Sequence, residues 1–200
     1  MALNADSAYQ EAIGRLRDMI DEARARGLEE PSAASLATTD LRGQPSIRMI
    51  SVVDIDDAGP LFFVDVRSGK GKQLVDNPGA ALCFYWPQLQ QQIVIEGHAQ
   101  AASRAVSDRL WATRPREAQL AAWVGEVAPN TDTPSAGEAL RDVRARFASQ
   151  PVPRPPHWQA MHLFPSVMQF WKPGWRNLHW RERYVRTDRS HWRVERVQAL

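Results

Sequence analysis

The alternation of apolar and polar residues divides the chain into one long helix followed by many short strands. Residues 7–27 carry apolar side chains at helical spacing, and Gly27 ends the pattern, which predicts an N-terminal helix. Strands are predicted where β-branched and aromatic residues cluster between turn signals. These stretches read "LATT", "SIRMISVVDID", "PLFFVDV", "AALCFYW", "QQQIVIEGHAQAA", "AMHLFPSVMQFW" and "RYVRTDRSHWRVERV", the last turning at "TDRS".

Shorter helices are predicted between some of these strands. "RSGKGKQLVDNPGA" reads as a short helix with Ser68 as its N-cap and "NPG" as its end. Ser103 opens a helix that runs to about Ala112, "RPRE" breaks it, and a second helix continues through "AQLAAWVG". "EALRDVRARFASQ" is an amphipathic helix, and the prolines of "PVPRPP" keep that segment extended.

This pattern predicts a mainly β protein with helices. Six or seven strands, mostly joined by hairpins, are typical of an antiparallel barrel with helices at its ends. Strands and helices do not alternate regularly, so a doubly wound sheet is not expected. Two hundred residues fit one domain with a helical appendage. We expect an N-terminal helix within residues 1–30 and one barrel domain over residues 31–200.

Composition narrows the class of protein. The chain is 44% apolar and 24% charged, as ordinary globular proteins are. No apolar run approaches the roughly 18 residues of a membrane span, and the N-terminus lacks the layout of a secretion signal, so no membrane partner is expected. Cys83 is the single cysteine and has no partner for an internal disulfide. A reducing cytoplasm is therefore the expected compartment.

Basic and aromatic residues gather near the C-terminus. From Lys172 to Arg196 there are eight Lys or Arg against three Asp or Glu, a net charge of +5. Within this region, "QFWKPGWRNLHWRERY" places aromatic planes beside guanidinium groups, which suits a flat anionic ligand. The pattern alone leaves open a nucleic acid, a phosphorylated cofactor, or a well-packed sheet.

Two further stretches are candidates for anion binding. Arg48 lies in a strand between apolar neighbours, where an arginine is usually paired or bound to an anion. "SGKGK" at 68–72 is either a phosphate seat at a capped helix start or a solvated glycine turn, and it lacks the G-x-x-x-x-G-K-[ST] motif.

Other chemistries have little support. The five histidines show no metal-ligand spacing, so no metal is expected, and no G-x-S-x-G elbow appears. If the chain does chemistry, a borrowed cofactor is the simplest source.

Several stretches in order resemble the pyridoxamine 5′-phosphate oxidase family. They include "LATTDLRGQPSIRMISVVDIDDAGPLFFVDVRSGKGKQLV", "ATRPREAQLAAWV", "VPRPPHW" and "FWKPGWRNLHWRERY", and the resemblance runs from about Ala34 to the C-terminus. It implies an FMN-binding split β-barrel of Greek-key type and a homodimer with two flavins at the subunit interface. The family reaction passes a hydride from pyridoxamine or pyridoxine phosphate to FMN, which O2 reoxidises.

The resemblance also implies the cofactor contacts. The family's R-x-x-L-L-K strand begins at Arg48 and includes Ile50 and Ser51, and its S-R-K turn places Ser68 and Lys70 at the FMN phosphate. The remaining matches are Phe63, Gln92, Trp171 and Arg181. Some flavin positions depart from the family: Gly69 replaces an arginine, Phe63-Val64 replaces Tyr-Thr, and Val127-Ala128 falls on a Gln-Ser pair.

The positions that match the family's substrate-binding residues depart further from the family pattern. The family holds the substrate phosphate with a lysine, a tyrosine, an arginine and a serine, and the matching positions are Val53, Leu110, Arg114 and Ala118. Its R-L-H group has become Asn177-Leu178-His179. Each hydrogen bond to a charged group contributes about 1.5–3 kcal/mol, so losing three partners would weaken phosphate binding on the order of a thousandfold.

Our leading hypothesis is an FMN-dependent oxidoreductase acting on a CH–NH2 or CH–OH donor other than pyridoxine phosphate, with O2 as a possible acceptor. Its substrate would be flatter or more apolar at the former phosphate end, with Arg114 meeting one acidic group and His179 orienting the ring. A true pyridoxamine phosphate oxidase and a flavin-binding barrel without turnover are the alternatives. Nucleic-acid binding is not expected, because the resemblance assigns the C-terminal aromatics to flavin.

Overall fold

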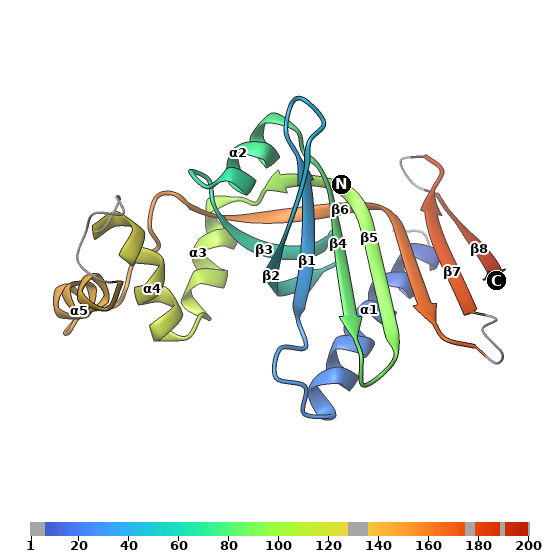
Figure 1. Ribbon diagram of the computed structural model, residues 1–200, viewed down its shortest axis with the longest axis horizontal. Coiled ribbons are helices and arrows are strands. Elements are labelled where there is room, and N and C mark those ends of the chain that lie inside the picture. Colours follow the sequence, from blue (N-terminus) through green and yellow to red (C-terminus); the bar gives the residue numbers. More distant parts are fainter. Residues whose placement is uncertain (1–6, 128–135, 175–178, 189–190, 200) are drawn as a thin grey trace.

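The computed structural model describes residues 7–127, 136–174, 179–188 and 191–199, and its centre is one antiparallel sheet of eight strands (Figure 1). The strand order is β3-β2-β1-β4-β5-β6-β7-β8, and an additional β3–β6 pairing closes the first six strands into a barrel. The strands are β1 (Ala33–Thr39), β2 (Pro45–Asp56), β3 (Gly59–Asp65), β4 (Gly79–Trp86), β5 (Gln91–Ala101), β6 (Trp158–Lys172), β7 (His179–Arg186) and β8 (Trp192–Ala199).

The order of the strands is that of a Greek key. After the β1-β2-β3 meander the chain returns to place β4 beside β1, which gives the spatial order β4-β1-β2-β3. The mainly β barrel predicted from the sequence is therefore confirmed. The predicted number of six or seven strands is wrong, because each segment on either side of "TDRS" forms its own strand.

The interior of the barrel is filled by rows of aliphatic side chains at matching register. Leu36 lies opposite Leu82, Leu82 opposite Ile95, and Ile95 opposite Met168, and all four are fully buried. Burying such a side chain stabilises the fold by about 1.5–3 kcal/mol. The strands alternate between this interior and the outer surface, so neighbouring residues of β2 face opposite sides.

Five helices surround the barrel within the described residues. They are α1 (Ser7–Ala25), α2 (Gly69–Asp76), α3 (Arg104–Ala112), α4 (Arg116–Val127) and α5 (Ala136–Arg146). In Figure 1, α3, α4 and α5 project from one end of the barrel and the β7–β8 hairpin from the other. Among the described residues, no helix combines the length and apolar character needed to cross a bilayer.

A second apolar cluster lies between the outer face of β3 and β6 and the helices α3 to α5. Its buried members include Leu61, Phe63, Leu110, Trp111 and Phe147. The α3–α4 break is shorter than "RPRE", because α4 begins at Arg116. Pro115 has no N–H to continue α3, but its carbonyl accepts from the Gln119 N–H at 3.1 Å and so opens α4.

Candidate functional site

Arg48 on β2 points to the barrel end where α2 packs. Its Nη1 donates to the Thr38 hydroxyl at 2.6 Å and to the Leu36 carbonyl at 3.1 Å, and its Nη2 lies 3.4 Å from the Gln73 side-chain oxygen. All three acceptors are neutral, and within the described ranges no carboxylate pairs with this guanidinium. Burial lowers the pKa of Arg48, as expected for a cation without an anionic neighbour.

The start of α2 is built as the sequence predicts. Ser68 is the N-cap: its hydroxyl accepts from the Gly71 N–H at 3.2 Å and donates to the Asp65 carbonyl at 2.6 Å. A Cβ at Gly71 would lie 2.3 Å from the Asp65 carbonyl oxygen, so only glycine lets the helix begin this close to β3. The junction therefore fixes the first turn of α2 against the barrel.

Lys70 lies in that first turn, on the same side of α2 as Gln73, which contacts Arg48. Lys70 is half-buried and has no hydrogen bond or ion pair within the residues that the structure describes. The backbone N–H groups of a first turn also lack helical partners. The structure thus brings Arg48, the capped start of α2 and Lys70 to one end of the barrel, an arrangement that suits a phosphate.

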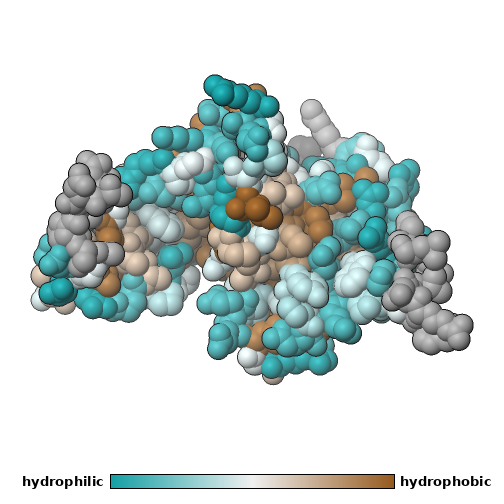
Figure 2. Space-filling view, in the orientation of Figure 1, coloured by the Kyte–Doolittle hydropathy of each residue, from teal (hydrophilic) through white to brown (hydrophobic). Residues whose placement is uncertain are grey.

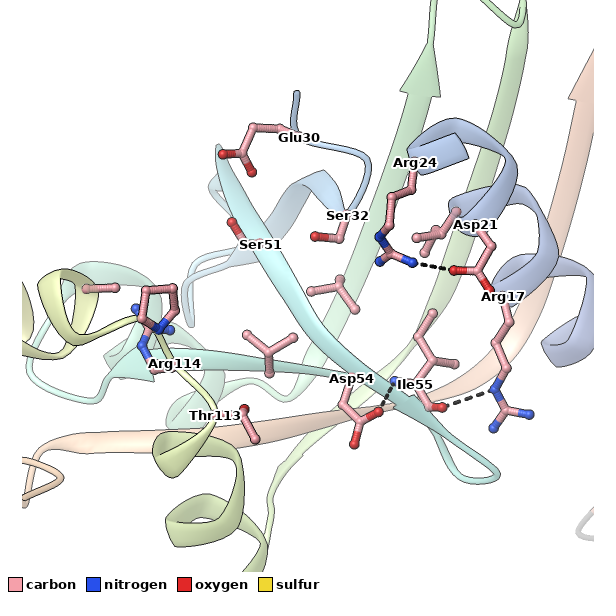
Figure 3. A pocket seen from close by; sticks show the side chains of 15 residues that line it. Arg17, Asp21, Arg24, Glu30, Ser32, Ser51, Asp54, Ile55, Thr113 and Arg114 are labelled. Carbon is pink, nitrogen blue, oxygen red and sulfur yellow. Dashed lines mark hydrogen bonds and ion pairs between the residues drawn. The ribbon is translucent and has the colours of Figure 1, made fainter. Parts of the chain in front are cut away.

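A cavity of about 740 Å³ lies beside β2 (Figure 3). Residues 51–55 of β2 form its floor, α1 and the segment after it form one wall, and the α3–α4 connection forms the other. Four residues proposed from the sequence line it together: Ser51, Val53, Arg114 and Ala118. The volume is typical of a pocket for a small organic molecule.

Arg114 is the cation that faces this cavity from the α3–α4 connection. Its guanidinium carbon lies 5.3 Å from the ring centres of Phe63 and Trp158 and 5.8 Å from that of Trp111. The Nε is buried and has no hydrogen-bond partner among the described residues. Burial lowers the pKa of Arg114. A cation with these surroundings, open to a cavity, suits an anionic ligand.

Three of the proposed contacts lie elsewhere. Phe63 is only 6% exposed and packs in the second apolar cluster, where its ring faces Arg114. Leu110 is 3% exposed in the same cluster and is not among the residues that line the cavity. Ile50 is half-buried against the barrel core. These side chains support the walls of the site.

A second hollow, of about 370 Å³, lies at the far edge of the barrel. It is lined by Tyr85, Gln92, Trp171, His179 and Arg181. Strand register assembles it, since Gln92 lies opposite Trp171 and Trp171 lies opposite Arg181. The structure thus groups three proposed flavin contacts with the proposed substrate contact His179.

One polar group of this second hollow is buried without a partner in the described residues, and a second is a cation open to solvent. The His179 ring lies 5.1 Å from that of Trp171, and its Nδ1 is buried without a hydrogen-bond partner among the described residues. Arg181 is exposed and forms no ion pair within the same part of the chain. A planar ligand with hydrogen-bonding groups would satisfy both. Asn177, also proposed from the sequence, lies outside the described residues.

Tyr85 and the α1 wall were missed by the sequence analysis. Tyr85 had a usable signal, because it alternates with the buried Phe84 and Trp86 and therefore faces outward beside Gln92. The cavity residues of α1 had none, because helical periodicity does not tell which strand a helix will meet. There, Arg17 donates from Nε to the Ile55 carbonyl at 3.1 Å, and Arg24 pairs with Asp21.

The two hollows are separate on one chain, since they have no lining residue in common. The first is formed by β2, α1 and the α3–α4 connection, and the second by β4, β5, β6 and β7. The residues proposed from the sequence therefore divide between two places.

Comparison with known proteins identifies the family of the chain. The family model described as pyridoxamine 5′-phosphate oxidase matches residues 19–156. The chain belongs to this family. A pyridoxine/pyridoxamine 5′-phosphate oxidase of Anaeromyxobacter dehalogenans is 39% identical over 193 residues, covering 96% of this chain and 97% of the relative. One from Nostoc punctiforme is 35% identical, covering 92% of this chain and 86% of its own.

Two solved structures share the fold. PhzG from Burkholderia lata, in complex with tetrahydrophenazine-1-carboxylic acid, has a TM-score of 0.81 and 31% identity, covering 94% of this chain and 92% of that one. A pyridoxamine 5′-phosphate oxidase-related, FMN-binding protein from Nostoc punctiforme has a TM-score of 0.75 at 20% identity, covering 99% and 100%. The barrel thus has the fold of these two proteins, the second of which is described as FMN-binding.

Proposed function

We propose that this protein is an FMN-dependent oxidoreductase whose substrate is a flat ring compound bearing one carboxylate. The observation that carries the proposal is Arg114. It is the one family phosphate anchor retained in sequence, and it faces the cavity from among three aromatic rings without an anionic partner in the described residues. One arginine on an aromatic wall suits a carboxylate on a planar ring better than a phosphate that needs several donors.

The residues present fit FMN. Arg48 has only neutral acceptors, and the Lys70 side chain and the backbone N–H groups of Gly69 and Lys70 add donors for a phosphomonoester. Gln92 and Trp171 supply an amide and an indole beside the unsatisfied His179 Nδ1, as a flat heterocycle with polar edges requires. The family membership and the FMN-binding fold support the same cofactor.

The chemistry divides between cofactor and protein. Bound FMN supplies the acceptor for a hydride from the substrate, and O2 is the proposed final oxidant. The chain binds and orients: Arg114 holds the carboxylate, the walls exclude water, and the free Nδ1 of His179 offers one hydrogen bond to the ring system.

The other three positions that match the family's phosphate anchors support a substrate without phosphate. Val53 and Ala118 line it where the family pattern has a lysine and a serine, and Leu110 is buried where the pattern has a tyrosine. These side chains offer apolar contact and no donors. The 31% identical PhzG structure contains tetrahydrophenazine-1-carboxylic acid, by name a partly reduced tricyclic ring with one carboxyl group, which is the class of ligand we propose.

The same proposal requires a homodimer, because the proposed flavin and substrate contacts divide between two separate hollows of one chain. The outer face of the barrel supports pairing: Ile47 is 71% exposed, Met49 64% and Tyr85 55%. Figure 2 shows apolar side chains gathered over the central strands of this face. Large apolar patches of this kind usually mark an interface. A second copy laid on this face would bring the Trp171 side of one chain to the Arg48 side of the other.

Complementation tests the homodimer. Two inactive variants, Arg48→Met and Arg181→Met, are co-expressed with different tags, and mixed dimers are isolated. One intact site per mixed dimer is expected, and hence about half the wild-type flavin content. If the mixed species binds no flavin, the site is not shared.

A true pyridoxamine phosphate oxidase is the second candidate, and the 39% and 35% identical relatives of that name favour it. A single experiment separates the two. The flavin-loaded protein is mixed anaerobically with pyridoxamine 5′-phosphate or with a reduced tricyclic carboxylic acid, and the visible spectrum is followed. We expect bleaching by the carboxylic acid at micromolar concentration and weak bleaching by the phosphate. The reverse order would establish the second candidate, and a yellow protein bleached by neither would indicate a binding protein.

The compartment follows from a separate observation. A chain with one cysteine suits a reducing compartment, and we propose the cytoplasm on that ground.

A further inference from the structure

α1 packs against the back of the strand that carries His179 and Arg181. The contact centres on Glu182 of β7, which is only 4% exposed. Arg15 of α1 donates from Nη1 to one carboxylate oxygen of Glu182 at 2.5 Å, and Arg196 of β8 donates from Nε to the other at 2.7 Å. The carboxylate therefore joins a helix from the N-terminus to both strands of the C-terminal hairpin.

Two aromatic rings hold Arg15 in addition to its ion pair with Glu182. Its guanidinium carbon lies 4.1 Å from the ring centre of Phe170 on β6 and 4.8 Å from that of Trp180 on β7. Phe170 is also the register partner of Glu182. One arginine thus contacts β6 and β7 at neighbouring positions, in a planar stack that a flexible lysine does not reproduce.

Further contacts extend the same interface. The Tyr184 hydroxyl donates to Glu11 of α1 at 2.9 Å, and Tyr9 stacks on Trp192 of β8 with ring centres 4.9 Å apart. Burial alone would raise the pKa of Glu182, but the hydrogen bonds from Arg196 and Arg15 lower it below its usual value. The carboxylate is accordingly held in its ionised form.

Strand alternation relates this cluster to the candidate site. On β7, Trp180, Glu182 and Tyr184 face α1, so His179 and Arg181 face the opposite side, where they line the 370 Å³ hollow. On β6, Phe170 lies opposite Glu182 and Trp171 lies opposite Arg181, so these two side chains also face different sides of the sheet. The β7–β8 hairpin lies beyond the closed barrel (Figure 1), and α1 covers its inner face.

We propose that Glu182 and Arg15 are positioning residues, which hold β7 so that His179 and Arg181 reach the flavin and its substrate. This inference rests on the proposed function. Neither residue touches the hollow itself. Their effect passes through the strand, because a neutral side chain at position 182 weakens the two charge-assisted hydrogen bonds that join α1, β7 and β8.

The chain offers a matched control on the same hairpin. Glu195 of β8 also accepts from two arginines, from Arg183 at 3.2 Å and from Arg193. It lies on the other face and has no contact with α1 among the described residues. Glu182→Gln and Glu195→Gln are therefore the same substitution in the same motif, and only the first releases the helix.

Two measurements test the proposal. One is the dissociation constant for FMN, from quenching of flavin fluorescence. The other is amide hydrogen exchange of residues 179–186 in the flavin-free protein. For Glu182→Gln we expect FMN binding about tenfold weaker or more and exchange faster by about tenfold, with less than about a twofold change in either for Glu195→Gln. A raised dissociation constant that Glu182→Asp partly restores would further separate positioning from general instability.

The outcomes are distinct. Glu182→Gln with wild-type FMN affinity and wild-type exchange overturns the inference. If the wild-type protein takes up no FMN, the proposed function fails, and exchange alone decides: faster exchange only in Glu182→Gln supports positioning, and unchanged exchange rejects it. If Glu182→Gln does not fold, Arg15→Lys, which keeps the charge but loses the planar stack, is read by the same two measurements and the same criteria.

Discussion

Arg48 and Arg114 are both half-buried arginines without a carboxylate partner in the described residues, yet their surroundings differ in kind. Arg48 is held by three neutral oxygens, from a carbonyl, a hydroxyl and an amide. Arg114 is surrounded by the rings of Phe63, Trp111 and Trp158, and its Nε is unsatisfied. Oxygens fix the direction of each N–H, whereas rings fix only the plane of the guanidinium. The first suits an anion bound permanently, and the second suits an anion that arrives and leaves with a flat molecule.

The largest expected effect is on the Arg48 side. Arg48→Met should weaken FMN binding by about 100-fold or more, because two charge-assisted hydrogen bonds of about 1.5–3 kcal/mol each are lost. Titration of the flavin-free protein with FMN measures this. Arg42→Met, in the exposed β1–β2 turn, is the matched control and should leave the affinity unchanged. A change below about threefold in Arg48→Met would remove Arg48 from the cofactor site.

Arg114→Met should weaken binding of a substrate-like acid and leave FMN binding unchanged. We expect tetrahydrophenazine-1-carboxylic acid to bind about 30-fold less tightly, since one charged contact on an aromatic wall is lost, while FMN affinity stays as in the wild type. Perturbation of the flavin spectrum by the acid reports its binding. Arg104→Met, at a side chain that is 91% exposed, is the control. Parallel loss of FMN and acid binding in Arg114→Met would abolish the distinction between the two arginines.

Val53→Lys should move the cavity toward phosphate. The new ammonium restores one donor of the family pattern at a position that lines the cavity, so kcat/KM for pyridoxamine 5′-phosphate should rise about tenfold. Steady-state peroxide release measures it. Val53→Met has a similar length without the charge and should give no gain. An equal gain from both variants would mean that size, and not charge, sets the preference.

Gly69→Arg should give the smallest change. A Cβ at Gly69 would meet no atom within 4 Å, so the position has room for a side chain, and an arginine there would restore the family's third cation beside the phosphate seat. Because the position is exposed, solvent screens the charge, and FMN should bind only about threefold more tightly at low salt. Gly69→Gln should show no gain, and the difference between the two should vanish near 1 M salt. A gain that persists in high salt would point to packing instead.

The parts of the molecule that the sequence predicted correctly are those encoded by near neighbours. The Ser68 cap is an interaction over three residues, and the barrel strands follow from alternation within each strand. The family resemblance also proposed Arg48, Gln92, Trp171 and Arg181 as site residues. Strand register places the last three side by side. None of these inferences needs the position of one element relative to a distant one.

The parts that were missed depend on such positions. The α1 wall joins Arg17 to Ile55, which no local pattern records. Phe63 and Leu110 were expected at the ligands because polar family residues occupy those positions. Apolar side chains gain free energy by withdrawing from a polar site, and both lie in the second cluster. Matching a position therefore does not establish that its side chain still faces the site.

The connection that carries Arg114 consists of residues 113–115, outside the ladder of barrel hydrogen bonds. Substitutions in this connection and at Val53 can therefore change the lining of the cavity without altering the strand pairing or the capped start of α2. Among relatives of this chain, we expect sequence differences that change ligand preference to lie at the rim of the cavity before they reach the barrel.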